Sequence, residues 1–244
     1  MTAVDYRHLD AARVIQTTEK LHARIQARFP SAGLSHVCAD CLSVARTLSQ
    51  EAARLSRPSW GWRLAIMALG VTGVFTLIAA LRLVHPEGLF SNATELVQGL
   101  EAAANLLILF GGAVWFLLTL EERAKRRRAF DALHSLRALA HVIDMHQLTK
   151  DPTIILNAHG TAASPERTMT RFELTRYLDY CAEMLALIGK IAALFADRMR
   201  DGMVIDAVND IEDLTNGLGR KIWQKISILS ALDDGETEAP SRNV

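Results

Sequence analysis

Two long apolar stretches constrain what this chain can fold into more than any other feature of the sequence. They cover residues 64–84 and 102–120 and contain few polar side chains. As a helix, either stretch is about 30 Å long, which is close to the hydrocarbon thickness of a bilayer. Buried helices of soluble proteins seldom stay apolar around their whole circumference over five turns. The sequence therefore predicts two transmembrane helices in preference to two core helices of a soluble protein.

The cations around these stretches predict how the chain crosses the membrane. Arg82, near the end of the first stretch, is the only Lys or Arg in residues 64–120, whereas ten lie close outside: Arg46, Arg54, Arg57, Arg63, Arg123, Lys125, Arg126, Arg127, Arg128 and Arg137. Cations close to a short span resist translocation. We therefore expect both termini in the cytoplasm and the connection 85–101 outside. The excess of 21 Arg over 6 Lys indicates a GC-rich bacterial genome and hence a bacterial inner membrane.

A basic block follows the second apolar stretch directly. It has five cations in six positions, namely Arg123, Lys125, Arg126, Arg127 and Arg128. We interpret the block first as a topology signal that stops translocation. It can in addition attract anionic lipid headgroups at the cytoplasmic face, with about 1 kcal/mol for each cation near the surface.

Two charged residues lie near the outer ends of the predicted spans. In a close hairpin, Arg82 and Glu101 reach a similar depth. Charges at that level either pair with one another or extend toward the interface. Extension to the interface is the simpler interpretation, and an ion pair between the two spans is the alternative.

The remaining segments carry helical patterns with one apolar stripe each. Steps of three and four residues, as in heptads, connect the members of two such stripes: Val14, Thr18, Leu21 and Ile25, and then Leu174, Leu178, Cys181, Leu185, Ile188, Ala192, Phe195 and Met199. Further helices are expected at 34–55, from the second span to about 148, and at about 202–232. Apolar stripes must be buried against one another, which predicts a helical bundle. Four heptads at 174–199 are also enough for a coiled coil, so we expect a homo-oligomer.

These patterns give an all-α membrane protein, a two-span hairpin with a cytoplasmic bundle built from the N- and C-terminal segments. The expected parts are an N-terminal helical hairpin at 1–63, spans at 64–84 and 102–120, the connection 85–101, a helical region at 121–232 and a disordered tail at 233–244. Asn92 and Glu95 have capping-box spacing ahead of the second span. The loop 151–170 is long for a helix connection, which is typical of mobile or functional loops.

Three groups of residues resemble chemical sites and also have a simpler structural interpretation. Cys38 and Cys41 have the spacing of redox or metal motifs, but they and Cys181 fall on apolar stripes, which favours packing. The remaining candidates are histidines and an acidic series along helices: His134, His141 and His146 near Asp144, and Asp206, Asp210 and Asp213. For these residues we expect hydrogen bonding or a solvated surface in preference to metal binding or proton sensing.

The sequence gives no indication of catalysis. It contains no nucleophile with its base, no phosphate loop and no dinucleotide fingerprint, so we expect neither an enzyme nor a bound cofactor or metal. Lys and Arg together number 27, as do Asp and Glu, which leaves no overall positive charge to attract nucleic acid. The expected partners are the lipid bilayer, further copies of the chain and a cytoplasmic protein.

Two functions from different classes are compatible with these features. The first is a non-enzymatic membrane anchor for a cytoplasmic bundle that self-associates, binds a partner or transmits a state. The alternative is an oligomeric ion channel, because small and polar residues occur inside the spans, namely Gly70, Thr72, Gly73, Thr76, Asn105, Gly111 and Gly112. In the order of its polar and apolar segments the chain looks similar to two-span effectors of bacterial conflict systems, which implies membrane perforation.

Overall fold

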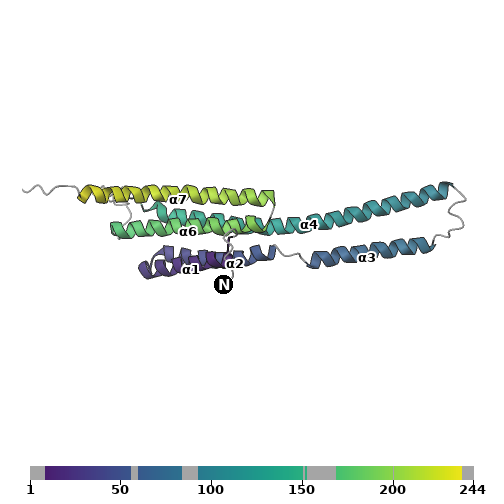
Figure 1. Ribbon diagram of the computed structural model, residues 1–244, viewed down its shortest axis with the longest axis horizontal. Helices are drawn as coiled ribbons and strands as arrows, with labels where there is room; N and C mark the ends of the chain where they lie inside the picture. Colours follow the sequence, from purple (N-terminus) through teal and green to yellow (C-terminus); the bar gives the residue numbers. More distant parts are fainter. Residues whose placement is uncertain are drawn as a thin grey trace, which may run out of the picture. The chain divides into compact units, whose positions relative to one another are not determined.

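The computed structural model describes residues 9–55, 60–83, 93–150, 152, 169–199 and 201–237. Over these residues the protein is all-helical and contains no strand, as the sequence predicts (Figure 1). Six helices make up this part of the chain: α1 (Ala11–Arg28), α2 (Gly33–Leu55), α3 (Trp60–Leu83), α4 (Ala93–Leu148), α6 (Arg171–Arg198) and α7 (Gly202–Thr237). The predicted connection 85–101 before Ala93, including Asn92, and the loop 151–170 between 153 and 168 lie outside the described residues.

The chain divides into two compact units. The first comprises Met1–Ser56 and Ala129–Val244, and the second comprises Arg57–Arg128. Helix α4 belongs to both, since its first part is in the second unit and its residues from Ala129 onward are in the first.

The first unit is a helical bundle around one hydrophobic core. Helices α1 and α2 form an antiparallel hairpin, and α6 packs against α1, α2 and α7. The apolar stripe predicted at 14–25 is buried, and that predicted at 174–199 is buried up to Phe195. The last part of α4 contributes Ala129, Leu133, Leu136, Ala140 and Ile143 to the same core. The predicted bundle of N- and C-terminal segments is therefore present in the structure.

Helix α6 is buried more widely than a single stripe predicts. Residues outside the predicted stripe are buried as well: Tyr177, Tyr180, Met184, Leu187, Ile191 and Leu194. These additional positions are needed because α6 packs against helices on more than one side, with α7 and the α1–α2 hairpin as its partners. The apolar stripe of α6, which we call the α6 seam, is thus covered by helices of the same chain.

Side chains fix the ends of several helices. Asp10 Oδ1 accepts a 2.9 Å hydrogen bond from the Ala12 N–H and caps α1, which begins at Ala11. At the end of α4, Lys225 Nζ donates to the Gln147 backbone oxygen at 2.9 Å and to Gln147 Oε1 at 2.6 Å. Helix α7 continues to Thr237, so the first residues of the predicted disordered tail are helical.

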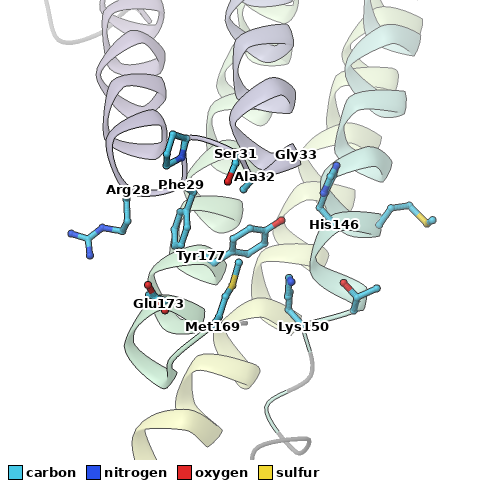
Figure 2. Close-up of a pocket in the computed structure, with 13 residues that line it drawn as sticks. Arg28, Phe29, Ser31, Ala32, Gly33, His146, Lys150, Met169, Glu173 and Tyr177 are labelled. Carbon is cyan, nitrogen blue, oxygen red and sulfur yellow. The ribbon is translucent and has the colours of Figure 1, made fainter. Parts of the chain in front are cut away.

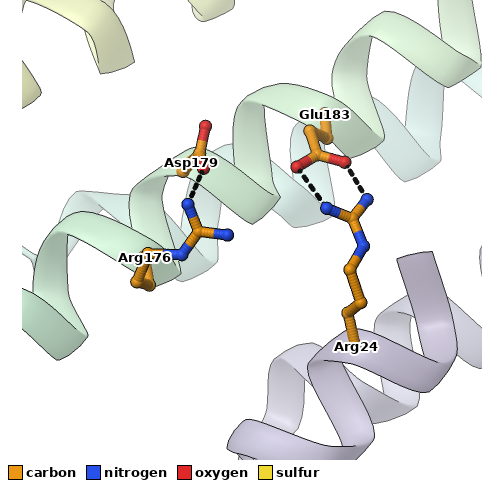
Figure 3. Close-up of polar contacts among 4 residues, drawn as sticks. All are labelled: Arg24, Arg176, Asp179 and Glu183. Carbon is orange, nitrogen blue, oxygen red and sulfur yellow. Dashed lines mark hydrogen bonds and ion pairs between the residues drawn. The ribbon is translucent and has the colours of Figure 1, made fainter. Parts of the chain in front are cut away.

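An ion pair connects the outer surfaces of α1 and α6, and a second one lies along α6 (Figure 3). The Arg24 guanidinium reaches from α1 to both carboxylate oxygens of Glu183 on α6, and Nη1 lies 3.1 Å from Oε1. On α6 itself, Arg176 donates to Asp179 Oδ2 at 2.8 Å. Arg24 and Arg176 also lie 5.7 Å and 5.2 Å from the ring centroid of Tyr180. These contacts orient the α1–α2 hairpin against α6.

Candidate functional site

One helix in the part of the chain that the structure describes is long and apolar enough to cross a membrane. It is α4, between Val97 and Leu148, and none of its most apolar window is buried within the protein. Large apolar side chains along it, such as Leu107, Leu109 and Trp115, are more than 70% exposed. Contiguous apolar surface of this kind marks an interaction site, and a helix of this length and composition fits a lipid bilayer. The predicted span 102–120 lies within this helix.

Helix α3 contains residues 64–83 of the other predicted span. Its apolar side chains are also exposed: Leu64, Met67, Val71, Val74, Phe75 and Ile78. Within the second unit α3 approaches α4 at a glycine, because a Cβ atom at Gly73 would lie only 2.9 Å from Phe110 Cε2. The Phe110 ring therefore packs on the surface that Gly73 leaves open.

The two threonines inside α3 have hydrogen-bond partners within their own helix. Thr72 donates its hydroxyl hydrogen to the Ala68 carbonyl at 2.9 Å, and Thr76 donates to the carbonyls of Thr72 and Gly73 at 3.0 Å and 2.9 Å. A threonine hydroxyl that bonds within its own helix can face lipid without an unsatisfied donor.

The basic block occupies one and a half turns of α4. Arg123, Arg127 and Arg128 are exposed, whereas Lys125 and Arg126 are half-buried. Lys125 Nζ lies 2.7 Å from Glu121 Oε1 one turn earlier. The block thus presents exposed guanidinium groups beside the apolar surface of the same helix.

The other charged pair predicted from the sequence lies on two different helices. Arg82 is in the last turn of α3 and Glu101 is in the first part of α4, and both side chains are exposed. An ion pair between them stays a prediction.

The cysteines lie in the bundle core, as expected from their position on the stripes. Cys38, Cys41 and Cys181 are free and fully buried. Burial raises the pKa of each thiol to about 12, and for Cys38 the nearby Arg24 charge opposes this effect. The described residues contain no cluster of His, Cys, Asp and Glu that could hold a metal ion. A neutral buried thiol is a poor nucleophile and a poor metal ligand.

The histidines and the acidic series are mostly on the surface. His134 and His141 are exposed, and His146 is half-buried next to α2. Asp206, Asp210 and Asp213 are exposed on α7. Of the three, Asp210 has an ion pair with Arg137 on α4 at 3.3 Å.

A cavity in the bundle was not predicted from the sequence. It measures about 630 Å³ and lies where the α1–α2 turn, the end of α4 and the start of α6 meet (Figure 2). Among its lining residues are His146, Lys150, Glu173 and Tyr177. The lining residues come from three segments that are far apart in the sequence, 28–33, 145–150 and 169–177, so periodicity within one helix does not predict the cavity.

Comparisons with protein-family models, with curated proteins and with solved structures give no match to this chain.

Proposed function

We propose that the chain is an integral membrane protein with two spans, α3 and the first part of α4, that holds a cytoplasmic helical bundle at a bacterial inner membrane. The observation that carries this proposal is the apolar window of α4, none of which is buried within the protein. A core helix of a soluble protein of the same composition would be covered by its neighbours. The exposed apolar side chains of α3 support the second span.

We further propose that the bundle acts by binding a protein partner and not by catalysis. The described part of the bundle has buried, neutral thiols and a filled α6 seam. Because that seam is occupied within the chain, self-association has to use the exposed surfaces of the bundle or of the spans. Anionic headgroups at the cytoplasmic face are expected partners of Arg123, Arg127 and Arg128.

The alternative of an ion channel receives less support from these contacts. The hydroxyls of Thr72 and Thr76 are satisfied within α3, so they do not need to line an aqueous path. Gly73 is used by the packing of Phe110, which accounts for a small residue at that position.

Labelling of single introduced cysteines tests the topology. The native cysteines provide a low background, because they are buried and their pKa values are raised to about 12. We expect a membrane-impermeant maleimide added to intact cells to label Ser91→Cys in the connection but not Ser241→Cys near the C-terminus. Both positions should react after the cells are opened.

A matched pair of variants tests the role of the basic block. Replacing its five cations by Gln should reduce the fraction of Ser91→Cys that is labelled from outside, because the retention signal is lost. The same number of neutralising changes at Arg13, Lys20, Lys190, Arg220 and Lys221 should leave the orientation unchanged. A chain that is recovered in the soluble fraction, or that shows no labelling at Ser91→Cys in intact cells, contradicts the two-span proposal.

A further inference from the structure

The cavity at the end of the bundle is lined only by residues of the first unit. Its volume of about 630 Å³ lies within the range of small-molecule sites, which is about 300–1,000 Å³. Three chain segments form its walls, residues 28–33, 145–150 and 169–177. Figure 2 shows His146, Lys150 and Tyr177 together in the middle of this region, with Arg28 directed away from it.

Arg28 and Lys150 are the two Lys or Arg residues that line the cavity, and Arg28 is directed away from it (Figure 2). Lys150 Nζ lies 5.4 Å from the ring centroid of Tyr177, and no carboxylate in the part of the chain that the structure describes forms an ion pair with it. An ammonium group that stands over an aromatic ring keeps donors available for an anion.

Glu173 is the acidic residue among those that line the cavity, but its carboxylate is already engaged. Its Oε2 accepts hydrogen bonds from the Thr170 N–H at 2.8 Å and from the Thr170 hydroxyl at 2.9 Å, which closes the capping box of α6. These bonds, together with the Arg28 charge, lower the pKa of Glu173. The carboxylate is therefore held at the first turn of α6 and does not pair with Lys150.

The remaining walls provide further donors and an apolar part. Ser31 and Thr149 carry hydroxyls, and His146 packs so closely against the start of α2 that a Cβ atom at Gly33 would lie 2.7 Å from its Cε1. The first turn of α2 adds partial positive charge from its N–H groups. Phe29, Tyr177 and two methionines, Met145 and Met169, supply the apolar lining.

We propose that this cavity binds an organic phosphate, with the phosphate group between Lys150 and His146 and the organic part against the apolar lining. Lysine binds phosphate as a point charge, and the His146 ring and the hydroxyls of Ser31 and Thr149 offer further donors to the three terminal oxygens of a phosphate monoester. The bundle would then bind a small ligand at the cavity while the spans hold it at the membrane. This proposal stands independently of the two-span topology, because all its residues belong to the first unit.

Isothermal titration calorimetry of the full-length protein with phenyl phosphate tests the proposal. The protein is held in nanodiscs of zwitterionic lipid or in detergent, and benzoate serves as the carboxylate comparison. We expect saturable binding of phenyl phosphate, weaker binding of benzoate, and a Kd raised about tenfold by Lys150→Gln or His146→Gln, because each removes a donor to a charged group. Lys190→Gln and His134→Gln are the matched controls, since both residues are exposed and outside the cavity.

The Kd values distinguish a lipid phosphate from a soluble phosphate, and they also show when the proposal is wrong. If anionic phosphatidylglycerol in the nanodisc raises the Kd for phenyl phosphate through Lys150, the site is retained and a lipid headgroup is its natural phosphate. An unchanged Kd in these nanodiscs identifies a soluble phosphate. Equal Kd values for the wild type, the cavity variants and the controls, with unchanged thermal unfolding, overturn the proposal.

Discussion

The three cysteine thiols show how burial changes the chemistry of single residues. Two of them have the spacing of a redox motif, but each is fully buried in the bundle core. Burial raises the pKa of each thiol to about 12, so the folded protein keeps them protonated at neutral pH. Spacing alone could not separate packing from reactivity, whereas the apolar stripes on which these residues lie could.

These pKa values predict that stability decreases at alkaline pH. The unfolded thiols ionise near pH 9 while the folded thiols stay protonated until about pH 12, so the stabilisation is complete below pH 9 and is lost as the pH rises toward 12. Each thiol then contributes a slope of up to about 1.4 kcal/mol per pH unit in the free energy of unfolding. Denaturant unfolding between pH 7 and about pH 10.5 measures this slope.

A triple variant with Cys38→Ala, Cys41→Ala and Cys181→Ala is the control for this effect. It should be less stable at neutral pH because of the small cavities it creates, but its stability should fall less steeply above pH 9. Equal slopes for the variant and the wild type would show that the thiols already ionise in the folded protein.

At the scale of helices, periodicity identified most of the bundle from the sequence. The stripe at 14–25 and most of that at 174–199 are buried because steps of three and four residues place these side chains on one face. The same reasoning could not show that α6 is buried on further faces, since Tyr177 and Tyr180 lie against Phe29, which follows α1 and is far away in the sequence. The cavity could not be predicted from periodicity either, because it forms where segments that are distant in the sequence meet.

The contact between α6 and α7 gives a prediction at the same scale. A Cβ atom at Gly189 on α6 would lie 3.2 Å from Thr215 Oγ1 on α7. We expect Gly189→Ala to be nearly neutral, because the gain in helix propensity offsets the tight contact. Gly189→Leu should lower the free energy of unfolding by about 1–3 kcal/mol, because the larger side chain separates the two helices.

Gly217 on α7 is the matched control for this substitution. A Cβ atom there meets nothing within 4 Å, so Gly217→Leu should be tolerated. Thermal unfolding followed by circular dichroism compares the two variants. If Gly189→Leu is as stable as Gly217→Leu, helices α6 and α7 do not approach each other closely at Gly189 and Thr215.

At the scale of the whole molecule, the question is whether the proposed spans serve as an anchor or enclose a pore. A pore needs a ring of spans with polar groups facing a common axis. Thr72 and Thr76 satisfy their hydroxyls within α3, and the α6 seam that could have assembled a larger ring is buried inside the chain. We therefore expect a monomer or a dimer, which has at most four proposed spans.

The mass of the full-length protein in nanodiscs, with the lipid contribution subtracted, tests this expectation directly. A mass of one or two chains of 26.9 kDa, together with no single-channel current in planar bilayers, agrees with an anchor. Gly73→Leu should then weaken the approach of α3 to Phe110 and lower stability without creating or abolishing a conductance. A defined ring of four or more chains with a current that this variant alters would instead establish the channel, because packing between the spans would then control conduction.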